Sequence, residues 1–478
     1  TTQLTLPVDN RINSTTSVFC DNLKIQSSSI IAIMEDLFVL FLFFSLPLCS
    51  VPTLPAAAAA ATSRPKALLA TISFDSSTSL YSFNLDNKHD LLLDVSSSNL
   101  WIDCLNPSSP FNLNSPTFKP VPCNSAICKK AIVCNSLVCS ASVPCATECP
   151  DAPSPICYNN TCSPFISNSA ISTSSIGTLW TDTFHVTPTD GRNPAPFTIE
   201  VPKLAFACTG AGLLENNSAP VGAVGGGGLS RALLALPTQL ASKFSLKRKF
   251  TYCLPAYPSG RGVLFFGQSP IVFQPQADFT NNFAYTPLIN NPKEPDSYFL
   301  GVKSISVNGA KLPINPTLFK LNQGNLRNGG VTISTTTRFT LLEPSIYKAL
   351  ARAFKAGANA RGIKSVAPVS PFDTCFDAST AYYTRVGYNV PDISFALQGS
   401  GSVSWTIVGA NSVVPVKDGK VICLAFQRRG EFEPKSIILG TYQQQNALVQ
   451  IDLATSRLGI IPSLVGQRAT CSNFNFTT

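Results

Sequence analysis

Two short segments carry the residues whose types and spacing could do chemistry. Asp94 follows the apolar run 91–93 and precedes Val-Ser-Ser-Ser, so a carboxylate stands at the end of an expected buried strand. Ser334 lies within Val-Thr-Ile-Ser-Thr-Thr-Thr and could suggest a serine nucleophile. Such a nucleophile needs a base beside it, and no motif places one there, because His89 and His185 are isolated. The sequence therefore offers one carboxylate and a group of hydroxyls.

Cysteine is the other reactive residue type. The chain has 478 residues and 16 cysteines, with a dense group between Cys104 and Cys162. A zinc site needs cysteine and histidine at tight spacing, and this group has no partnering histidine. We therefore expect disulfides formed in an oxidising compartment, and neither a bound metal nor a cofactor.

The first sixty residues contain a targeting segment. An apolar run from Leu37 to Cys49 follows Met34, the single methionine, and an alanine tract comes next. The run is too short to span a bilayer and has the form of a secretory signal. We interpret residues 34–62 as a signal peptide with an alanine-rich leader, and residues 1–33 as a segment upstream of the native start. No later apolar run reaches membrane length, so the mature protein is expected to be secreted and soluble.

A secreted chain can carry glycans, and Asn159, Asn216 and Asn475 each head an Asn-X-Ser/Thr sequence. The net charge is +9, from 35 basic and 26 acidic residues. The basic residues are scattered and do not form a stripe with interleaved aromatics, which argues against nucleic-acid binding. Attraction to acidic surfaces, such as pectin-rich walls or acidic proteins, is the milder expectation.

The elements that must position these residues are mostly short strands. Hydrophobic residues make up 44% and charged residues 13%, which favours a large core, and the 37 prolines favour turn-rich connections. We expect strands over 67–72, 79–83, 91–94, 250–266 (as strand, turn, strand), 298–302 and 305–307, the last two joined by a turn, and helices over 233–244 and 344–358. An Asn- and Pro-rich stretch near 287–295 predicts a lobe boundary.

Three motifs resemble the signatures of the pepsin-like aspartic proteases, in that family's order. Residues Asp94–Ile102 resemble its first active-site motif, Asp-Thr-Gly-Ser-Ser-Asn-Leu-Trp-Val. Residues Val221–Gly225 are similar to the hydrophobic-glycine signature of the first lobe, and Ile437–Gly440 followed by Val449–Gly459 resemble that of the second. The resemblance implies an all-β fold with minor helix, in which two β-barrel-like lobes enclose a central cleft.

The resemblance also sets the expected domains. The N-terminal lobe would span residues 63–288 and include a disulfide-rich loop at 104–162. The C-terminal lobe would span residues 289–478.

That family's catalytic residues are incomplete in this chain. An aspartic protease holds two carboxyl groups that share one proton and activate water. Asp94 is kept, but Val95 and Ser96 replace the threonine and glycine that follow it, and Ser334 stands where the second aspartate belongs. A serine hydroxyl cannot share a titrating proton at mild pH, so most of the rate would be lost. We interpret Asp94 and Ser334 as vestigial and the chain as a protein without protease activity.

Two smaller features accompany this interpretation. The segment 165–169 lacks the Tyr-Gly pair of the family's flap. Asp452 is interpreted as a structural residue at the end of a strand, where it would bond a turn.

Within the pepsin-like proteins, the chain most resembles the plant extracellular dermal glycoproteins and xyloglucan-specific endoglucanase inhibitors, with basic 7S globulins and cereal xylanase inhibitors as broader relatives. The stretches that carry this resemblance are Ser242–Phe250, Tyr298–Ile305 and Cys471–Thr477. It covers the chain from about Arg64 onwards and departs in the cysteine-rich loop, where an extra pair is expected among Cys134, Cys139, Cys145 and Cys149. A second-lobe disulfide is expected between Cys375 and Cys423.

This resemblance implies inhibition of microbial glycoside hydrolases, either a xyloglucan endoglucanase or a xylanase, in the plant apoplast or cell wall as part of plant defence. Inhibitory members insert arginines from surface loops into the target's cleft, and Arg385 and Arg468 lie in loops that look like those. A glycosidase presents two carboxylates roughly 5–10 Å apart, with which guanidinium groups can pair. The alternative is that both are solvated surface arginines.

Two other functions stay open from the sequence. One is a residual or altered aspartic endopeptidase, against which Ser334 argues. The other is a storage or peptide-binding protein, as the resemblance to basic 7S globulins allows. Cell-wall polysaccharide is a further possible partner, whereas neither nucleic acid nor a membrane is expected.

Overall fold

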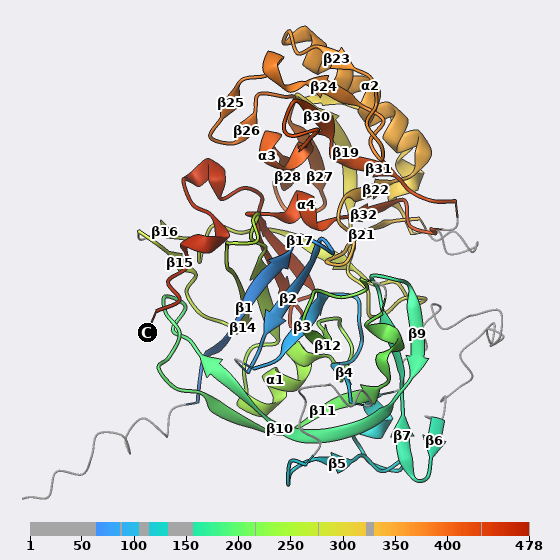
Figure 1. Cartoon of the computed structure of the whole chain (residues 1–478), viewed down its shortest axis with the longest axis vertical. Coiled ribbons are helices and arrows are strands. Elements are labelled where there is room, and N and C mark those ends of the chain that lie inside the picture. Colours follow the sequence, from blue (N-terminus) through green and yellow to red (C-terminus); the bar gives the residue numbers. More distant parts are fainter. Residues whose placement is uncertain are drawn as a thin grey trace, which may run out of the picture. The chain divides into compact units, whose positions relative to one another are not determined.

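Strands dominate the fold, as the sequence predicts (Figure 1). The structure is a computed structural model that describes residues 64–477 except 87, 105–113, 132–155, 216, 276, 322–328 and 432. In this part of the chain, one 18-stranded sheet is accompanied by six smaller sheets of two or four strands. None of the helices described is long and apolar enough to cross a membrane.

Four strands of the first half hold Asp94 at the end of a parallel pair. Strand β3 (Asp90–Asp94) runs parallel to β12 (Ala223–Gly228), β12 runs antiparallel to β4 (Trp101–Asp103), and β4 runs parallel to β11 (Ile199–Thr209). Asp94 lies opposite Gly228. A Cβ added to Gly228 would lie 2.3 Å from the backbone oxygen of Asn99, so only glycine fits there.

The expected position of the first-lobe glycine signature is therefore wrong. It was placed at residues 221–225, but Val221 is 79% exposed in the turn before β12. The glycine opposite Asp94 is Gly228, at the end of a run of four glycines, where no side-chain pattern marks the register.

Four strands of the second half repeat this arrangement around Ser334. Strand β21 (Val331–Ile333) runs parallel to β32 (Ile437–Leu439), β32 antiparallel to β22 (Thr340–Leu342), and β22 parallel to β31 (Phe426–Arg428). The amide of Ser334 donates to the carbonyl of Leu439 at 3.0 Å. A Cβ added to Gly440 would lie 2.6 Å from the carbonyl carbon of Phe339. Ser334 thus stands in its repeat where Asp94 stands in the first.

The two halves share the central sheet. Strand β13 (Lys249–Cys253) pairs with β14 (Gly262–Gly267) on one side and with β33 (Leu448–Asp452) on the other. Strand β33 then pairs with β34 (Arg457–Ile461), and β34 with β17 (Ala284–Ile289). At the end of β33, Asp452 accepts from the amides of Ala454 and Thr455 at 3.1 Å, which confirms its structural role.

Both expected helices are present. Helix α1 (Leu236–Phe244) ends at Ser245, which takes a left-handed conformation. Helix α2 (Pro344–Ala360) begins after Glu343, whose carboxylate accepts from the amides of Ser345 and Ile346 and so satisfies two free donors of the first turn. Ser345, which was expected near the start, lies one residue inside the helix.

The turn expected after residue 302 is absent. The structure has β18 (Phe299–Leu300) and then a continuous strand β19 (Val302–Val307), which pairs with β27 (Ile393–Leu397). The chain changes sheets at Gly301, where an added Cβ would lie 2.3 Å from the Gln398 side chain. The break therefore falls at the glycine, because the backbone approaches its neighbour closely there.

The other elements complete the sheets and their connections. They are β1 (Ala67–Asp75), β2 (Leu80–Asn84), β5 (Lys119–Pro120), β6 (Ile156–Tyr158), β7 (Thr161–Ser163), β8 (Phe165–Asn168), β9 (Thr173–Ile176), β10 (Thr178–Pro188), β15 (Val272–Phe273), β16 (Ala277–Asp278), β20 (Ala310–Lys311), β23 (Ser365–Val366), β24 (Cys375–Asp377), β25 (Tyr383–Thr384), β26 (Gly387–Tyr388), β28 (Ser404–Ile407), β29 (Val413–Val416), β30 (Val421–Leu424), α3 (Gly409–Ser412) and α4 (Thr441–Gln444).

Disulfides connect segments that lie far apart in the sequence. The described pairs are Cys104–Cys208, Cys123–Cys157, Cys128–Cys162, Cys253–Cys471 and Cys375–Cys423. The last is the pair expected for the second lobe. Cys134, Cys139, Cys145 and Cys149, among which an extra pair was expected, lie outside the described residues.

Candidate functional site

Asp94 is buried and bonded to backbone amides through both oxygens. Asp94 is only 1% exposed. Oδ1 accepts from the amide of Ser96 at 2.8 Å, and Oδ2 accepts from the amide of Ser169 at 3.3 Å. Burial raises the pKa of the Asp94 carboxyl above its ordinary value, and the hydrogen bonds from Ser169 and Ser96 only partly offset it. The site therefore favours the neutral form more than water does.

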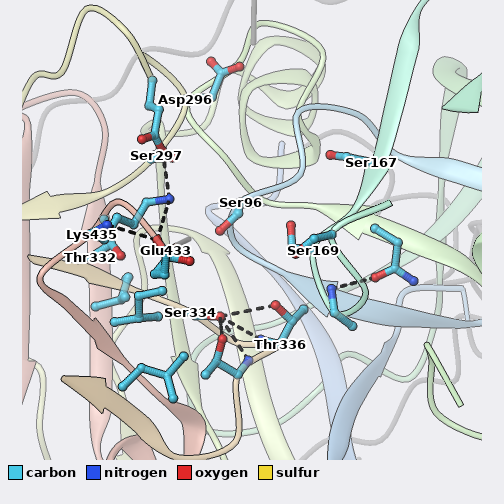
Figure 2. Close-up of a pocket in the computed structure, with 18 of the residues that line it drawn as sticks. Ser96, Ser167, Ser169, Asp296, Ser297, Thr332, Ser334, Thr336, Glu433 and Lys435 are labelled. Atoms are coloured by element: carbon cyan, nitrogen blue, oxygen red, sulfur yellow. Dashed lines mark hydrogen bonds and ion pairs between the residues drawn. The ribbon is translucent and has the colours of Figure 1, made fainter. Parts of the chain in front are cut away.

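The hairpin β8–β9 holds Ser169 over that carboxyl. Asn168, the last residue of β8, is fully buried, and its Nδ2 donates to the carbonyls of Leu213 and Ser218 at 2.8 and 2.9 Å. Its Oδ1 accepts from the amide of Ala170 at 2.9 Å. Because the tip is anchored on both sides of Ser169, the hairpin covers Oδ2 of Asp94 without the Tyr-Gly pair of the protease family. Figure 2 shows Ser169 at the edge of the neighbouring cavity.

Ser334 occupies a small nest of donors at the end of β21. Ser334 is 7% exposed, and its Oγ accepts hydrogen bonds from the amides of Thr336 and Thr337 at 3.2 and 3.1 Å. The same oxygen lies 3.2 Å from Thr336 Oγ1 and 3.0 Å from Thr337 Oγ1 (Figure 2). Two backbone amides that converge on one oxygen would suit a carboxylate as well as a hydroxyl.

A single threonine joins the two turns. Thr335 is fully buried, and its Oγ1 donates to the carbonyl of Leu93 at 2.6 Å and accepts from the amide of Val95 at 3.1 Å. Val95 holds the equivalent place in the first repeat and has no hydroxyl to return these bonds. Thr335 of the second turn therefore bonds the first turn, but the first turn has no hydroxyl that bonds the second turn in return.

No second acid meets Asp94 in the part of the chain that the structure describes. Its partners there are not acids: the backbone amides of Ser96 and Ser169 donate to it, and the Ser169 hydroxyl and the Ser97 amide also act to lower its pKa. The groups nearest to a catalytic arrangement are therefore one covered carboxyl and one hydroxyl, which cannot bind and activate water as a carboxyl pair does.

A polar cavity of about 240 Å³ opens between the two turns and the hairpin. Hydroxyls dominate its lining, which includes Ser96, Ser169, Ser334 and Thr336 but not Asp94. Figure 2 shows these side chains around one space.

Charged residues that the sequence did not single out also line this cavity. Lys435 Nζ pairs with Glu294 at 3.1 Å, and the Glu294 side chain is 6% exposed. Asp296 Oδ2 accepts from the Ser98 hydroxyl at 2.8 Å, and burial raises the pKa of Asp296. Glu294 lies in the segment 287–295 that was interpreted only as a lobe boundary, Asp296 directly follows it, and no motif marks either residue.

Arg385 and Arg468 lie on adjoining loops. Arg385 is exposed between β25 and β26, and Arg468 is exposed directly after the short 3₁₀ helix η7 (Val465–Gln467), with φ 61°. A Cβ added to Gly466 would lie 3.9 Å from Cγ1 of Val386, so the two loops lie close to each other. Among the described residues, neither guanidinium has a hydrogen-bond or ion-pair partner.

The predicted glycosylation sites differ in their surroundings. Asn159 is exposed in the turn between β6 and β7. Asn475 Nδ2 donates to Asn193 Oδ1 at 2.7 Å, and a glycan would replace one of the two hydrogens of this nitrogen. Asn216 lies outside the described residues. In the part of the chain searched, no three His, Cys, Asp or Glu side chains gather as metal ligands would.

Comparison with known proteins agrees with this architecture. The family model described as xylanase inhibitor N-terminal matches residues 81–268, and the one described as xylanase inhibitor C-terminal matches residues 297–461. A probable aspartic proteinase GIP2 of Nicotiana benthamiana is 38% identical over 433 residues, which cover 87% of this chain and 93% of that protein.

Two solved structures extend the comparison. The crystal structure of edgp is 37% identical, with a TM-score of 0.76 over 87% of this chain and 99% of that one. The crystal structure of basic 7S globulin from soybean is 28% identical, with a TM-score of 0.69 over 86% and 98% of the two chains. The pepsin-like fold expected from three sequence motifs is confirmed.

Proposed function

The chain belongs to the xylanase-inhibitor family of pepsin-like proteins, and from this premise we propose that it is a proteolytically inactive, secreted inhibitor of microbial glycoside hydrolases in the plant apoplast or cell wall. The target is a xyloglucan endoglucanase or a xylanase. The observation that carries the proposal is the pair of adjoining loops that present Arg385 and Arg468 to solvent.

Two features support the absence of proteolysis. Ser334 follows β21 much as Asp94 ends β3, which supports the proposal that serine replaces the second catalytic aspartate. The second feature is the burial of Asp94 beneath the hairpin, whose Ser169 amide donates to Oδ2, because a covered carboxyl is poorly placed to bind a water molecule. Loss of one acid of a carboxyl pair by itself removes most of its activity.

The arginine loops have the chemistry to block a glycosidase. A glycosidase needs two carboxyl groups, roughly 5–10 Å apart, on opposite sides of the bond it cleaves. A guanidinium is always charged and can donate two parallel hydrogen bonds to one carboxylate. Because Arg385 and Arg468 have no partner within the described chain, they give up no internal ion pair when they bind.

The test is an inhibition assay on a panel of fungal xyloglucanases, endoglucanases and xylanases. Arg385→Ala and Arg468→Ala should each weaken inhibition of the target. Arg352→Ala is the matched control, because Arg352 is an exposed arginine on α2, away from both loops. A panel in which no enzyme is inhibited would overturn the proposed function, and equal inhibition by all variants would remove these arginines from the mechanism.

A second candidate function rests on the polar cavity. The relative from soybean is a basic 7S globulin, and a cavity lined by hydroxyls, Asp296 and Lys435 offers donors and acceptors to a peptide backbone. A storage or peptide-binding role would be favoured if seed-derived peptides bound with affinity lost on Asp296→Ala while no hydrolase was inhibited.

A further inference from the structure

Three surface segments meet around the arginine loops: 254–261, 378–391 and 462–472. A Cβ added to Gly260 would lie 2.6 Å from Ser472 Oγ, so the first segment contacts the third. Gly466 lies close to Val386, since a Cβ added to it would be 3.9 Å from Cγ1 of Val386, which brings the third segment beside the second. The disulfide Cys253–Cys471 fixes the first and third segments to each other. They therefore form one continuous face (Figure 1 shows β25, β26 and the C-terminal segment).

This face exposes tyrosines. Tyr257, Tyr382 and Tyr383 are 67%, 70% and 67% exposed, and they are the only tyrosines among the large apolar side chains that the described residues leave exposed. The ring of Tyr383 packs edge-on against Tyr388, with centroids 5.0 Å apart. Partial burial and then the neighbouring hydroxyls of Tyr257 and Tyr388 raise the pKa of Tyr383.

The charged side chains within the three segments are all basic, whereas Asp377 and Asp392 flank the second segment. The three segments contain Arg261, Arg385 and Arg468 and no aspartate, glutamate or lysine. Exposed aromatic rings beside arginines are the combination enriched where proteins bind proteins, and tyrosine and arginine predominate among residues that dominate binding energy. Tyrosine also offers a large, rigid contact area at a low cost in conformational entropy.

We propose that Tyr257, Tyr382 and Tyr383 form a tyrosine platform that packs into the sugar-binding subsites of the inhibited hydrolase, beside the carboxylates that Arg385 and Arg468 reach. The inference rests on the proposed function and names the part of the target that the face recognises. Pockets that bind small ligands are concave and lined largely by apolar and aromatic side chains with few polar groups. Tyrosine rings can stack on such walls in the place of sugar rings.

The same face fits a polysaccharide less well. A neutral polysaccharide offers flat sugar faces to the tyrosines but nothing of opposite charge to three arginines. A hydrolase cleft offers both, since its catalytic carboxylates lie among its sugar-binding walls. The combination of rings and unpartnered positive charge therefore favours the enzyme over its substrate.

The experiment compares inhibition constants for the most strongly inhibited xyloglucanase or xylanase. We expect Tyr383→Ala and Tyr257→Ala to raise the inhibition constant about tenfold or more each. Tyr383→Phe should keep inhibition near the wild-type level, because it keeps the ring. Phe197→Ala is the control, because Phe197 is an exposed aromatic of 48% exposure outside the three segments. Oligosaccharides that fill the subsites should compete with the inhibitor.

The outcomes separate this inference from the function on which it rests. If the alanine variants inhibit like the wild type while the arginine variants do not, the tyrosine platform is wrong and the proposed function stands. If the tyrosine variants lose retention on immobilised xyloglucan but keep full inhibition, the platform binds polysaccharide and the inference is overturned. If the wild type inhibits no hydrolase, both the tyrosine platform and the proposed function are wrong. Unfolding temperatures equal to the wild type would exclude misfolding as the cause.

Discussion

The backbone amide of Ser169 donates a hydrogen bond of 3.3 Å to Oδ2 of Asp94, from a hairpin tip 75 residues further along the chain. A working carboxyl pair shares one proton between its two acids and activates a water molecule. Here a backbone donor occupies one acceptor position of Oδ2, and the anchoring of Asn168 keeps that donor in place. The hairpin as well as the second turn therefore supports the proposed absence of proteolysis.

Restoring the second acid alone should not restore proteolysis. Ser334→Asp would place a carboxylate against the amides of Thr336 and Thr337, but Asp94 would stay covered by the Ser169 amide. We expect no peptide hydrolysis above the background of wild type in an assay at acidic pH. Hydrolysis by the variant that a transition-state mimic of aspartic proteases blocks would contradict this.

The contact between the two turns should depend on one hydroxyl. Thr335→Val keeps the shape of the side chain but leaves the carbonyl of Leu93 and the amide of Val95 without this buried partner. We expect a loss of about 1–3 kcal/mol in the free energy of unfolding, measured by denaturant titration. Thr198→Val, at an exposed threonine, should have little effect, and equal stabilities of the two variants would refute the role of Thr335.

Asp452 should make stability depend on acid pH. Although burial acts to raise it, bonds from Thr455 and the charge of Lys249, 3.4 Å away, hold the pKa of Asp452 below 3.8. The stabilisation is therefore complete above pH 3.8 and is lost as the pH falls through the lower, folded value. Asp452→Asn should cost about 1.5–3 kcal/mol at pH 7 and less near pH 2, as thermal unfolding at both values would reveal. A difference independent of pH would argue that the charge is unimportant.

The arginine loops should make inhibition sensitive to salt as well as to truncation. Each of Arg385→Ala and Arg468→Ala is expected to weaken inhibition by about 2–5 kcal/mol if the contacts are desolvated, measured as the inhibition constant. Because exposed charges attract over roughly a Debye length, the association rate should fall with ionic strength, and less steeply in the double variant. An association rate that does not change with ionic strength would argue against pairing of these arginines with carboxylates.

The sequence predicted the helices and the pepsin-like framework well because both have strong local signals. Apolar spacing marked α1 and α2, and Asp94–Ile102 marked the first turn. The glycine signature was misplaced because four consecutive glycines give no side-chain pattern from which to read the strand register. The turn after residue 302 was wrong because Gly301, a point of close backbone approach, lies earlier in the chain.

The parts of the site that the sequence could not supply are contacts between distant segments. The cover over Asp94 is made by the backbone amide of Ser169, which no residue type encodes. The proximity of the loops of Arg385 and Arg468 depends on how a hairpin and the C-terminal segment pack, and no local pattern predicts it. Motifs identified these residues individually, and the fold decides which of them meet.

The bond between Cys253 and Cys471 closes a loop of 218 residues that contains nearly all of the second half of the chain. A single backbone cut anywhere inside that loop would produce two fragments that stay covalently attached to each other. If a peptidase cleaved the backbone once within this loop, the two ends of the loop and the surface that they form would therefore remain in one molecule.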